Sequence, residues 1–223
     1  MTTGAIVVAA GRGERLGADV PKALVRVGGR TLLEHAVDAV QAAPGVDTVV
    51  VAAPPESVDE FASLVPSARV VAGGAMRQDS VRLALASLPA DVDVVLVHDA
   101  ARAFVPVAVV QRVLAAVNAG ADAVVPVVLL ADTVKEVDAA MSVVRTVDRA
   151  SLRAVQTPQG FRRDVLERAH AAATGPATDD AALVEALGGV VTTVDGSPEA
   201  LKVTTPFDLL VADAVLTRRR AHV

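Results

Sequence analysis

The sequence predicts an α/β fold in which a doubly wound, mostly parallel sheet carries helices on both faces. Short runs of valine and alanine alternate along the chain with amphipathic segments, as strands and helices do in such folds. The runs are apolar throughout, which is typical of strands that are buried on both faces. Hydrophobic residues make up 52% of the chain and aromatic ones only 2%, so alanine, valine and leucine must build the core. At 223 residues we expect one domain, 1–223.

The expected strands and helices follow one another in a regular order. The apolar runs predict strands at 5–10, 46–53, 69–71, 92–98, 123–128 and 190–194. The amphipathic segments predict helices at 31–43, 56–65, 77–88, 106–119, 161–173, 179–187 and 205–216. Thr31 and Glu34 have the spacing of a capping box. Since ligands of such sheets bind outside the carboxyl ends of the strands, the loops that follow the strands are the candidate site.

Residues 129–155 interrupt this alternation. Two valine-rich stretches, 133–137 and 142–147, flank a short polar segment and predict a β-hairpin. The hairpin is too small to bury a core of its own. We therefore expect a protruding β-hairpin arm, residues 130–155, that packs on a second copy and makes a homodimer. A hairpin folded back on its own sheet is the alternative.

Composition excludes several classes of function. The net charge of −5 and the absence of Trp and Tyr argue against a nucleic-acid-binding surface. Without cysteine the chain has no disulfide, no thiolate nucleophile and no thiolate zinc site. We see no signal peptide before the first strand and no apolar run of membrane-spanning length, so a cytoplasmic protein with no membrane partner is expected.

The loop after the first strand is the strongest candidate for binding phosphate. Gly11-Arg12-Gly13-Glu14-Arg15 turns the backbone, and its bare N–H groups can form an anion site. Arg12, Arg15 and Lys22 surround this turn with positive charge. The segment is not a Walker loop, because no Lys-Ser or Lys-Thr pair follows a glycine here. It is not the dinucleotide fingerprint either, because the glycine spacing of that motif is one residue shorter. The arrangement predicts a nucleotide phosphate chain, with an ordinary solvated turn as the alternative.

Other strand ends carry polar residues that could complete this site. Asp99 emerges from a buried strand and could hold Mg²⁺ or orient a polar substrate, while Arg102 could take a phosphate. Gly73-Gly74 exposes backbone groups that could read a base. Basic residues comprise 18 arginines and only three lysines, Lys22, Lys135 and Lys202. Such sparse lysines suggest positions that need a compact point charge, as phosphate contacts do.

Taken together, these segments resemble the 2-C-methyl-D-erythritol 4-phosphate cytidylyltransferase family of nucleotidyltransferases. The motifs AAGRGERLG…PKAL, GG…R.DSV, HDAAR, DTVKEV, TVDR, QTPQ.F, TDDA and KVT.P.D occur in the family's order over nearly the whole chain. The resemblance implies a Rossmann-like nucleotidyltransferase fold and a dimer built by a β-arm. It also implies CTP and a divalent cation, usually Mg²⁺.

The resemblance further implies a role for each matched position. The catalytic residues would be Arg15, Lys22 and Lys202. The nucleotide would be bound by Ala9, Ala10, Gly11, Gly13, Gly74, Ala75, Ser80 and Asp99. The acceptor phosphate would be bound by Ala100, Arg102, Thr133, Arg149, Thr157 and Thr178. A metal ion would be held mainly by CTP phosphates, with Asp99 as a weak protein ligand.

The implied reaction joins CTP and 2-C-methyl-D-erythritol 4-phosphate into 4-diphosphocytidyl-2-C-methyl-D-erythritol, with release of pyrophosphate. It belongs to non-mevalonate isoprenoid biosynthesis. Two alternatives remain open at this stage. One is a cytidylyltransferase for another polyol phosphate such as ribitol 5-phosphate, and the other is a noncatalytic nucleotide-binding regulator on the same fold.

Overall fold

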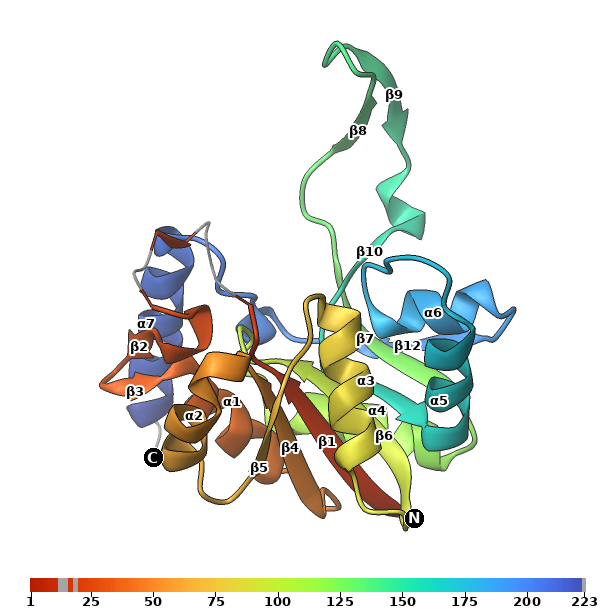
Figure 1. The fold of residues 1–223 in the computed structure, drawn as a ribbon. Helices are drawn as coiled ribbons and strands as arrows, with labels where there is room; N and C mark the ends of the chain where they lie inside the picture. Colours follow the sequence, from red (N-terminus) through yellow and green to blue (C-terminus); the bar gives the residue numbers. More distant parts are fainter. Residues whose placement is uncertain (12–15, 18–19, 222–223) are drawn as a thin grey trace.

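An eight-stranded mixed sheet forms the centre of the computed structural model, which describes residues 1–11, 16–17 and 20–221 (Figure 1). The strand order is β10-β7-β11-β6-β1-β4-β5, and β12 also pairs with β7. The strands are β1 (Thr2–Val8), β4 (Thr48–Ala53), β5 (Arg69–Ala72), β6 (Val92–Asp99), β7 (Ala123–Leu129), β10 (Arg153–Val155), β11 (Gln159–Arg162) and β12 (Val191–Asp195). Strands β5, β4, β1 and β6 run parallel to one another, as does the β7–β12 pair.

Helices cover both faces of this sheet, as expected for a doubly wound fold. Helices α1 (Leu32–Gln41), α2 (Val58–Leu64) and α4 (Val107–Asn118) pack on the face to which Ala5 and Val7 point. Helices α3 (Arg77–Ser87), α5 (Arg163–Ala172) and α6 (Asp180–Ala186) pack on the opposite face, against Ile6. Successive residues of a strand point to opposite faces of the sheet, so a continuous apolar run contributes side chains to the core on each face. The predicted capping box of Thr31 and Glu34 is present at α1.

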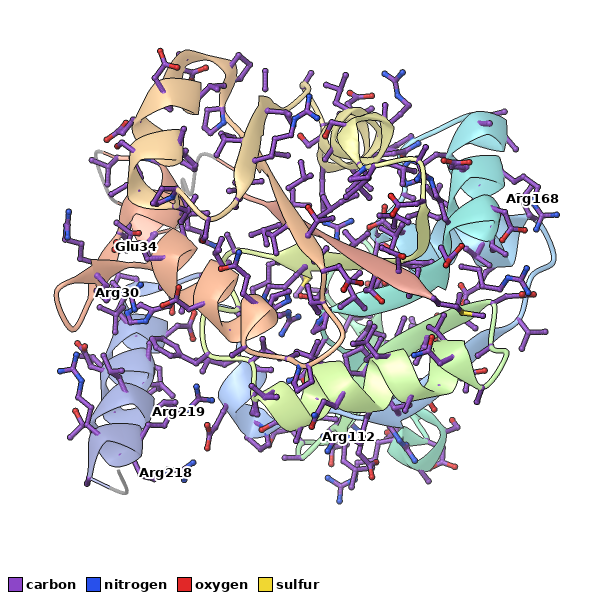
Figure 2. All side chains as sticks on the ribbon, turned by 90° about the horizontal axis from the view of Figure 1, so that it is seen from below. Arg30, Glu34, Arg112, Arg168, Arg218 and Arg219 are labelled. Carbon is purple, nitrogen blue, oxygen red and sulfur yellow. The ribbon has the colours of Figure 1, made fainter. Side chains whose placement is uncertain are left out.

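Helix α7 (Pro206–Arg220) closes a third, smaller cluster beside the short hairpin β2 (Arg26–Val27) and β3 (Arg30–Thr31). It runs four residues beyond the expected end at 216, because the arginines there form its last turn. Figure 2 labels Arg218 and Arg219 at this end of the helix, and Arg219 donates to Glu199 at 2.6 Å. Cations in the last turn of a helix complement the helix dipole.

Several expected element boundaries are wrong: the first strand covers Thr2–Val8 in place of 5–10, and one helix begins later than expected. The helix predicted at 161–173 begins at Arg163, because Phe161 lies on β11. This strand runs antiparallel between β6 and β7, so the sheet is mixed at that side. Gly160 lets β11 lie close to α4, since a Cβ there would come within 2.5 Å of Val113. A four-residue strand that contains glycine and ends in arginine has no apolar periodicity by which it could be detected.

A hairpin is present where the sequence predicts one. Strands β8 (Val134–Val137) and β9 (Val143–Val147) pair with each other in a separate two-stranded sheet. Figure 1 shows this hairpin projecting away from the main sheet. Residues 153–155, at the end of the expected arm range, instead form β10 and pair with β7. Within the part of the chain described, none of the helices combines the length and apolar character needed to cross a membrane.

Candidate active site

A cleft of about 1190 Å³ opens at the carboxyl ends of β1, β4, β5 and β6. Its walls come from the segments that follow these four strands, joined by two stretches from elsewhere in the chain. The lining residues are Val8–Gly11, Val20–Ala23, Pro54–Glu56, Gly73–Arg77, Ser80, Asp99–Ala101 and Lys202. The cleft lies where parallel sheets bind their ligands.

The loop after β1 contributes the glycine-rich wall and the first lysine. Ala9, Ala10 and Gly11 line the cleft, and the Ala9 N–H donates to the Ala52 carbonyl at 2.9 Å. Lys22 begins a short 3₁₀ turn after Pro21 and lines the same cleft. The expected contributions of Arg12, Gly13 and Arg15 lie outside the described residues.

The loop after β5 is held to α3 by a serine hydroxyl. The Ser80 hydroxyl accepts from the Gly74 N–H at 3.1 Å and donates to the Met76 carbonyl at 3.1 Å. A Cβ at Gly74 would come within 2.3 Å of Asp79, so the loop can approach the helix only with glycine there. Gly74, Ala75 and Ser80, all predicted for nucleotide binding, therefore line one wall of the cleft.

Asp99, at the end of β6, is the buried anion of the site. Its Oδ2 lies 2.7 Å from Lys202 Nζ, and its Oδ1 accepts from Arg77 Nε at 3.1 Å. Burial by itself would raise the pKa of Asp99, but the charges of Arg77 and Lys202 outweigh it and hold that pKa well below its usual value. Asp99 is therefore an anion at neutral pH and a partner for the Lys202 ammonium.

Arg77 has a second carboxylate partner that the sequence did not reveal. Its Nη1 donates to Asp180 Oδ2 at 2.6 Å, and Asp180 Oδ1 lies 2.9 Å from His170 Nε2. Asp179 is the N-cap of α6, and its side chain accepts from the Ala182 N–H. Asp180 itself is buried and falls on the apolar stripe of α6 with Leu183 and Val184. An acidic residue at an apolar helix position is a signal that could have indicated a buried partner.

Arg102 and Thr157 lie beside Asp99 but outside the lining of the cleft. The Arg102 guanidinium donates to the carbonyls of Ala200 and Val155 at 2.8 and 3.1 Å, and its buried Nε has no protein partner. Burial lowers the pKa of Arg102, although Asp99 opposes that shift. Thr157 Oγ1 accepts from the Asp99 N–H at 3.1 Å.

His98 supports Thr157 from the interior. Its Nδ1 lies 3.0 Å from Thr157 Oγ1, and the ring is completely buried. Burial lowers the pKa of His98 to about 4, so the imidazole is neutral at pH 7. His98 is therefore a buried, neutral residue that supports Thr157.

Three predicted substrate residues lie away from the cleft of the same chain. Thr133 precedes β8 and Arg149 follows β9, so both belong to the projecting hairpin region. The Arg149 guanidinium donates to the Ala131 carbonyl. Thr178 is exposed in the loop before α6. None of the three is among the described residues that line the cleft.

The described residues offer little to a metal ion. They contain no group of three His, Asp or Glu side chains arranged to hold one. Glu56 and Asp99 are the carboxylates among the described lining residues, and both oxygens of Asp99 already have cationic partners.

Comparison with known proteins agrees with this geometry. The family model for IspD, 2-C-methyl-D-erythritol 4-phosphate cytidylyltransferase, matches residues 3–218. The chain is 58% identical to the 2-C-methyl-D-erythritol 4-phosphate cytidylyltransferase of Saccharopolyspora erythraea, covering 97% of this chain and 100% of that protein. It is also 58% identical to the protein of that name from Frankia casuarinae, covering 96% of this chain and 81% of that protein.

Solved structures give the same result. The crystal structure of 2-C-methyl-D-erythritol 4-phosphate cytidylyltransferase from Thermus thermophilus matches with a TM-score of 0.80 at 39% identity, covering 95% of this chain and 97% of that one. The structure of 4-diphosphocytidyl-2C-methyl-D-erythritol synthase from Anaerococcus prevotii matches with a TM-score of 0.85 at 28% identity, covering 96% of each. The chain therefore belongs to the 2-C-methyl-D-erythritol 4-phosphate cytidylyltransferase family of nucleotidyltransferases.

Proposed function

We propose that this chain transfers the cytidylyl group of CTP to 2-C-methyl-D-erythritol 4-phosphate, releasing pyrophosphate, as a step of non-mevalonate isoprenoid biosynthesis in the cytoplasm. The observation that carries the proposal is the convergence of Lys22, Asp99 and Lys202 on one cleft, beside the loops after β1 and β5. Two lysines of only three in the chain thus line the same cavity. Such clustered cations suit a reaction between two phosphates.

The reaction needs positioning and charge stabilisation more than proton transfer. An oxygen of the acceptor phosphate forms a bond to the α-phosphorus of CTP, and the bond from that phosphorus to the bridging oxygen of pyrophosphate breaks. The attacking oxygen is already anionic near neutral pH, so no general base is required. The enzyme must instead bring two anions together in line and stabilise the charge on the crowded phosphorus.

The cations divide this work between the two sides of the cleft. Lys22, on the side of the glycine-rich loop, contacts the α-phosphate, and Arg15 is assigned to the same phosphate chain. Lys202 acts from the opposite side, where Asp99 holds its ammonium at 2.7 Å. Arg102, whose guanidinium lies beside Asp99, is assigned to the incoming phosphate.

The loop after β5 reads the nucleoside in this proposal. Gly74 and Ala75 line the cleft, and Ser80 stabilises the loop by two hydrogen bonds. Backbone N–H and C=O groups held in fixed positions can distinguish the hydrogen-bonding edge of cytosine from those of other bases.

A divalent cation, usually Mg²⁺, is proposed to enter with CTP. When bound it supplies positive charge that neutralises the phosphates. Asp99 by itself does not fit the role of a principal metal ligand, because Arg77 and Lys202 already occupy its two oxygens. The CTP phosphates are therefore assigned as the main ligands of the ion.

The arm is proposed to complete the site of a second copy in a homodimer. The hairpin exposes Met141, Val143 and Val144, which a monomer would leave in water. Thr133 and Arg149 lie near its base, outside the lining of their own cleft, and are assigned to the partner's acceptor phosphate. Light scattering of the purified protein should give a dimer at micromolar concentration. A monomer under these conditions would contradict this part of the proposal.

Turnover with two acceptors tests the proposed substrate. Pyrophosphate release from CTP and Mg²⁺ should be rapid with 2-C-methyl-D-erythritol 4-phosphate and slow with ribitol 5-phosphate. A preference for ribitol 5-phosphate would show that the acceptor is assigned wrongly. Tight CTP binding without turnover on either acceptor would instead indicate a noncatalytic nucleotide-binding protein.

A further inference from the structure

A row of ionisable side chains runs from the cleft into the interior, and the proposed reaction uses only its outer end. Lys202 Nζ lies 2.7 Å from Asp99, and Asp99 lies 3.1 Å from Arg77. Arg77 lies 2.6 Å from Asp180, and Asp180 lies 2.9 Å from His170. The five residues come from the loop before α7, the end of β6, and helices α3, α6 and α5. The row therefore joins parts of the chain that are distant in sequence.

Arg77 is the member on which the row depends. Its guanidinium uses two different nitrogens, Nε for Asp99 and Nη1 for Asp180. The side chains of Asp180 and His170 are only 1% and 3% exposed, so no substrate can reach them. Without Arg77 two buried carboxylates would lose their shared cation, which is strongly unfavourable. The charge of Arg77 is retained in turn, since the two carboxylates outweigh the effect of burial and raise the pKa of Arg77.

The inner end of the row determines how Asp99 is oriented at the outer end. Arg77 occupies Asp99 Oδ1, which leaves Oδ2 turned toward Lys202. The Lys202 side chain is 42% exposed, and a lysine has no planar fork to fix its own direction. Its ammonium is therefore placed largely by Asp99. Arg77 is also the first residue of α3, directly after the loop of Gly74, so it links the nucleoside wall to the acceptor wall.

We propose that Arg77 is a positioning residue for cytidylyl transfer: Asp180 and His170 hold it, and it fixes Asp99 and thereby the ammonium of Lys202. The inference rests on the role proposed above for Lys202. A lysine at position 77 would keep the charge, but a single ammonium cannot reproduce the planar contacts of a guanidinium with two carboxylates. The effect of Arg77→Lys should therefore appear in the chemical step and should depend on Lys202.

A double-mutant cycle tests this dependence. Arg77→Lys, Lys202→Ala and the double variant are compared with the wild type in kcat and KM for CTP and for 2-C-methyl-D-erythritol 4-phosphate. Arg77→Lys should lower kcat roughly 10- to 100-fold, the range that misplacement of a reacting group produces, and should change either KM less than roughly 3-fold. In the Lys202→Ala background it should lower kcat less than roughly 3-fold further.

The control is Arg82→Lys on the same helix. Arg82 is exposed and pairs with Asp79 at a distance of 3.7 Å, away from the buried row. This variant should keep the wild-type kcat, and circular dichroism with CTP titration should show that all variants fold and bind nucleotide. If Arg77→Lys does not fold, Asp180→Asn replaces it in the cycle, because the amide keeps the shape and loses the charge that holds Arg77.

The outcomes separate this inference from the proposed function. If Arg77→Lys caused its full loss of kcat both in the wild type and in the Lys202→Ala background, Arg77 would act independently of Lys202. That result would overturn the inference. A wild-type kcat in folded Arg77→Lys, or in its replacement Asp180→Asn, would also overturn it while leaving the proposed function intact. A wild-type kcat in Lys202→Ala would instead remove Lys202 from the proposed reaction, and the inference would fail with it.

Discussion

At the scale of single residues, the sparse lysines are the most informative feature of the sequence. Lys22 and Lys202 both line the cleft, while Lys135 lies on the projecting hairpin. The sequence alone therefore indicated two of the cations that the structure brings together. It did not indicate Arg77 or Asp180, because a residue's partner across 103 positions cannot be found from local pattern. Side-chain pairs of this kind arise from tertiary packing.

Removal of the Lys22 ammonium should affect chemistry more than folding. Loss of one preorganised charge at a reaction centre typically lowers kcat roughly 10²-fold, and Lys22→Ala should do at least this. Steady-state kinetics at saturating CTP and acceptor measures the effect. The control is Arg168→Ala, because Figure 2 labels Arg168 on the outer side of α5 and its side chain is 70% exposed. A near-wild-type kcat in Lys22→Ala would exclude the lysine from the mechanism.

The buried His98 should make stability depend on pH. The folded protein holds its pKa at about 4, whereas the unfolded chain takes up the proton near pH 6.5. The contribution of the neutral histidine to the free energy of unfolding is therefore complete above pH 6.5 and is lost as the pH falls toward 4. Between these two pH values the unfolded chain binds one proton more than the folded protein, so the free energy of unfolding falls by about 3 kcal/mol.

Denaturant unfolding between pH 7 and pH 4 checks this, with His98→Asn as the comparison. The asparagine amide can still meet Thr157 and does not titrate in this range. The wild type should lose more unfolding free energy than the variant across the window. Parallel pH profiles for the two proteins would show that His98 does not contribute.

At the scale of secondary-structure elements, most of the sheet could be predicted, but the short strands β10 and β11 could not. The valine-rich strands β1, β4, β6 and β7 are long apolar runs, so their positions follow from composition. Strand β11 has four residues and contains Gly160, and its place between β6 and β7 is a consequence of tertiary packing. The predicted hairpin is present because its strands meet at a tight turn, which is a local property.

The close packing of β11 against α4 predicts a cost for any side chain at Gly160. A Cβ there would come within 2.5 Å of Val113 and 3.1 Å of Val117, so Gly160→Ala should destabilise the fold by about 1–3 kcal/mol. Gly175→Ala is the matched control, because a Cβ at that position meets nothing within 4 Å. Denaturant midpoints of the two variants measure the difference. Equal stability would mean that β11 can shift without cost.

At the scale of the whole molecule, the account requires residues from two chains to form one site. Mixing Lys22→Ala subunits with Arg149→Ala subunits tests this requirement. If Arg149 acts on the partner's site, each mixed dimer has one cleft with both residues intact. Activity should therefore rise above that of either variant alone after the subunits are exchanged. If Arg149 acts within its own chain, every cleft in the mixture lacks one residue and the activity should stay low.

The most direct test of the whole account is to follow the phosphorus atoms of the reaction by ³¹P NMR. With CTP, Mg²⁺ and 2-C-methyl-D-erythritol 4-phosphate, the acceptor monoester signal should disappear. In its place a coupled pair of diphosphate signals and the signal of pyrophosphate should grow at equal rates. The same mixture with the Lys22→Ala variant should change far more slowly. Persistence of CTP and the monoester with the wild-type enzyme, or release of orthophosphate in place of pyrophosphate, would contradict the proposed cytidylyl transfer.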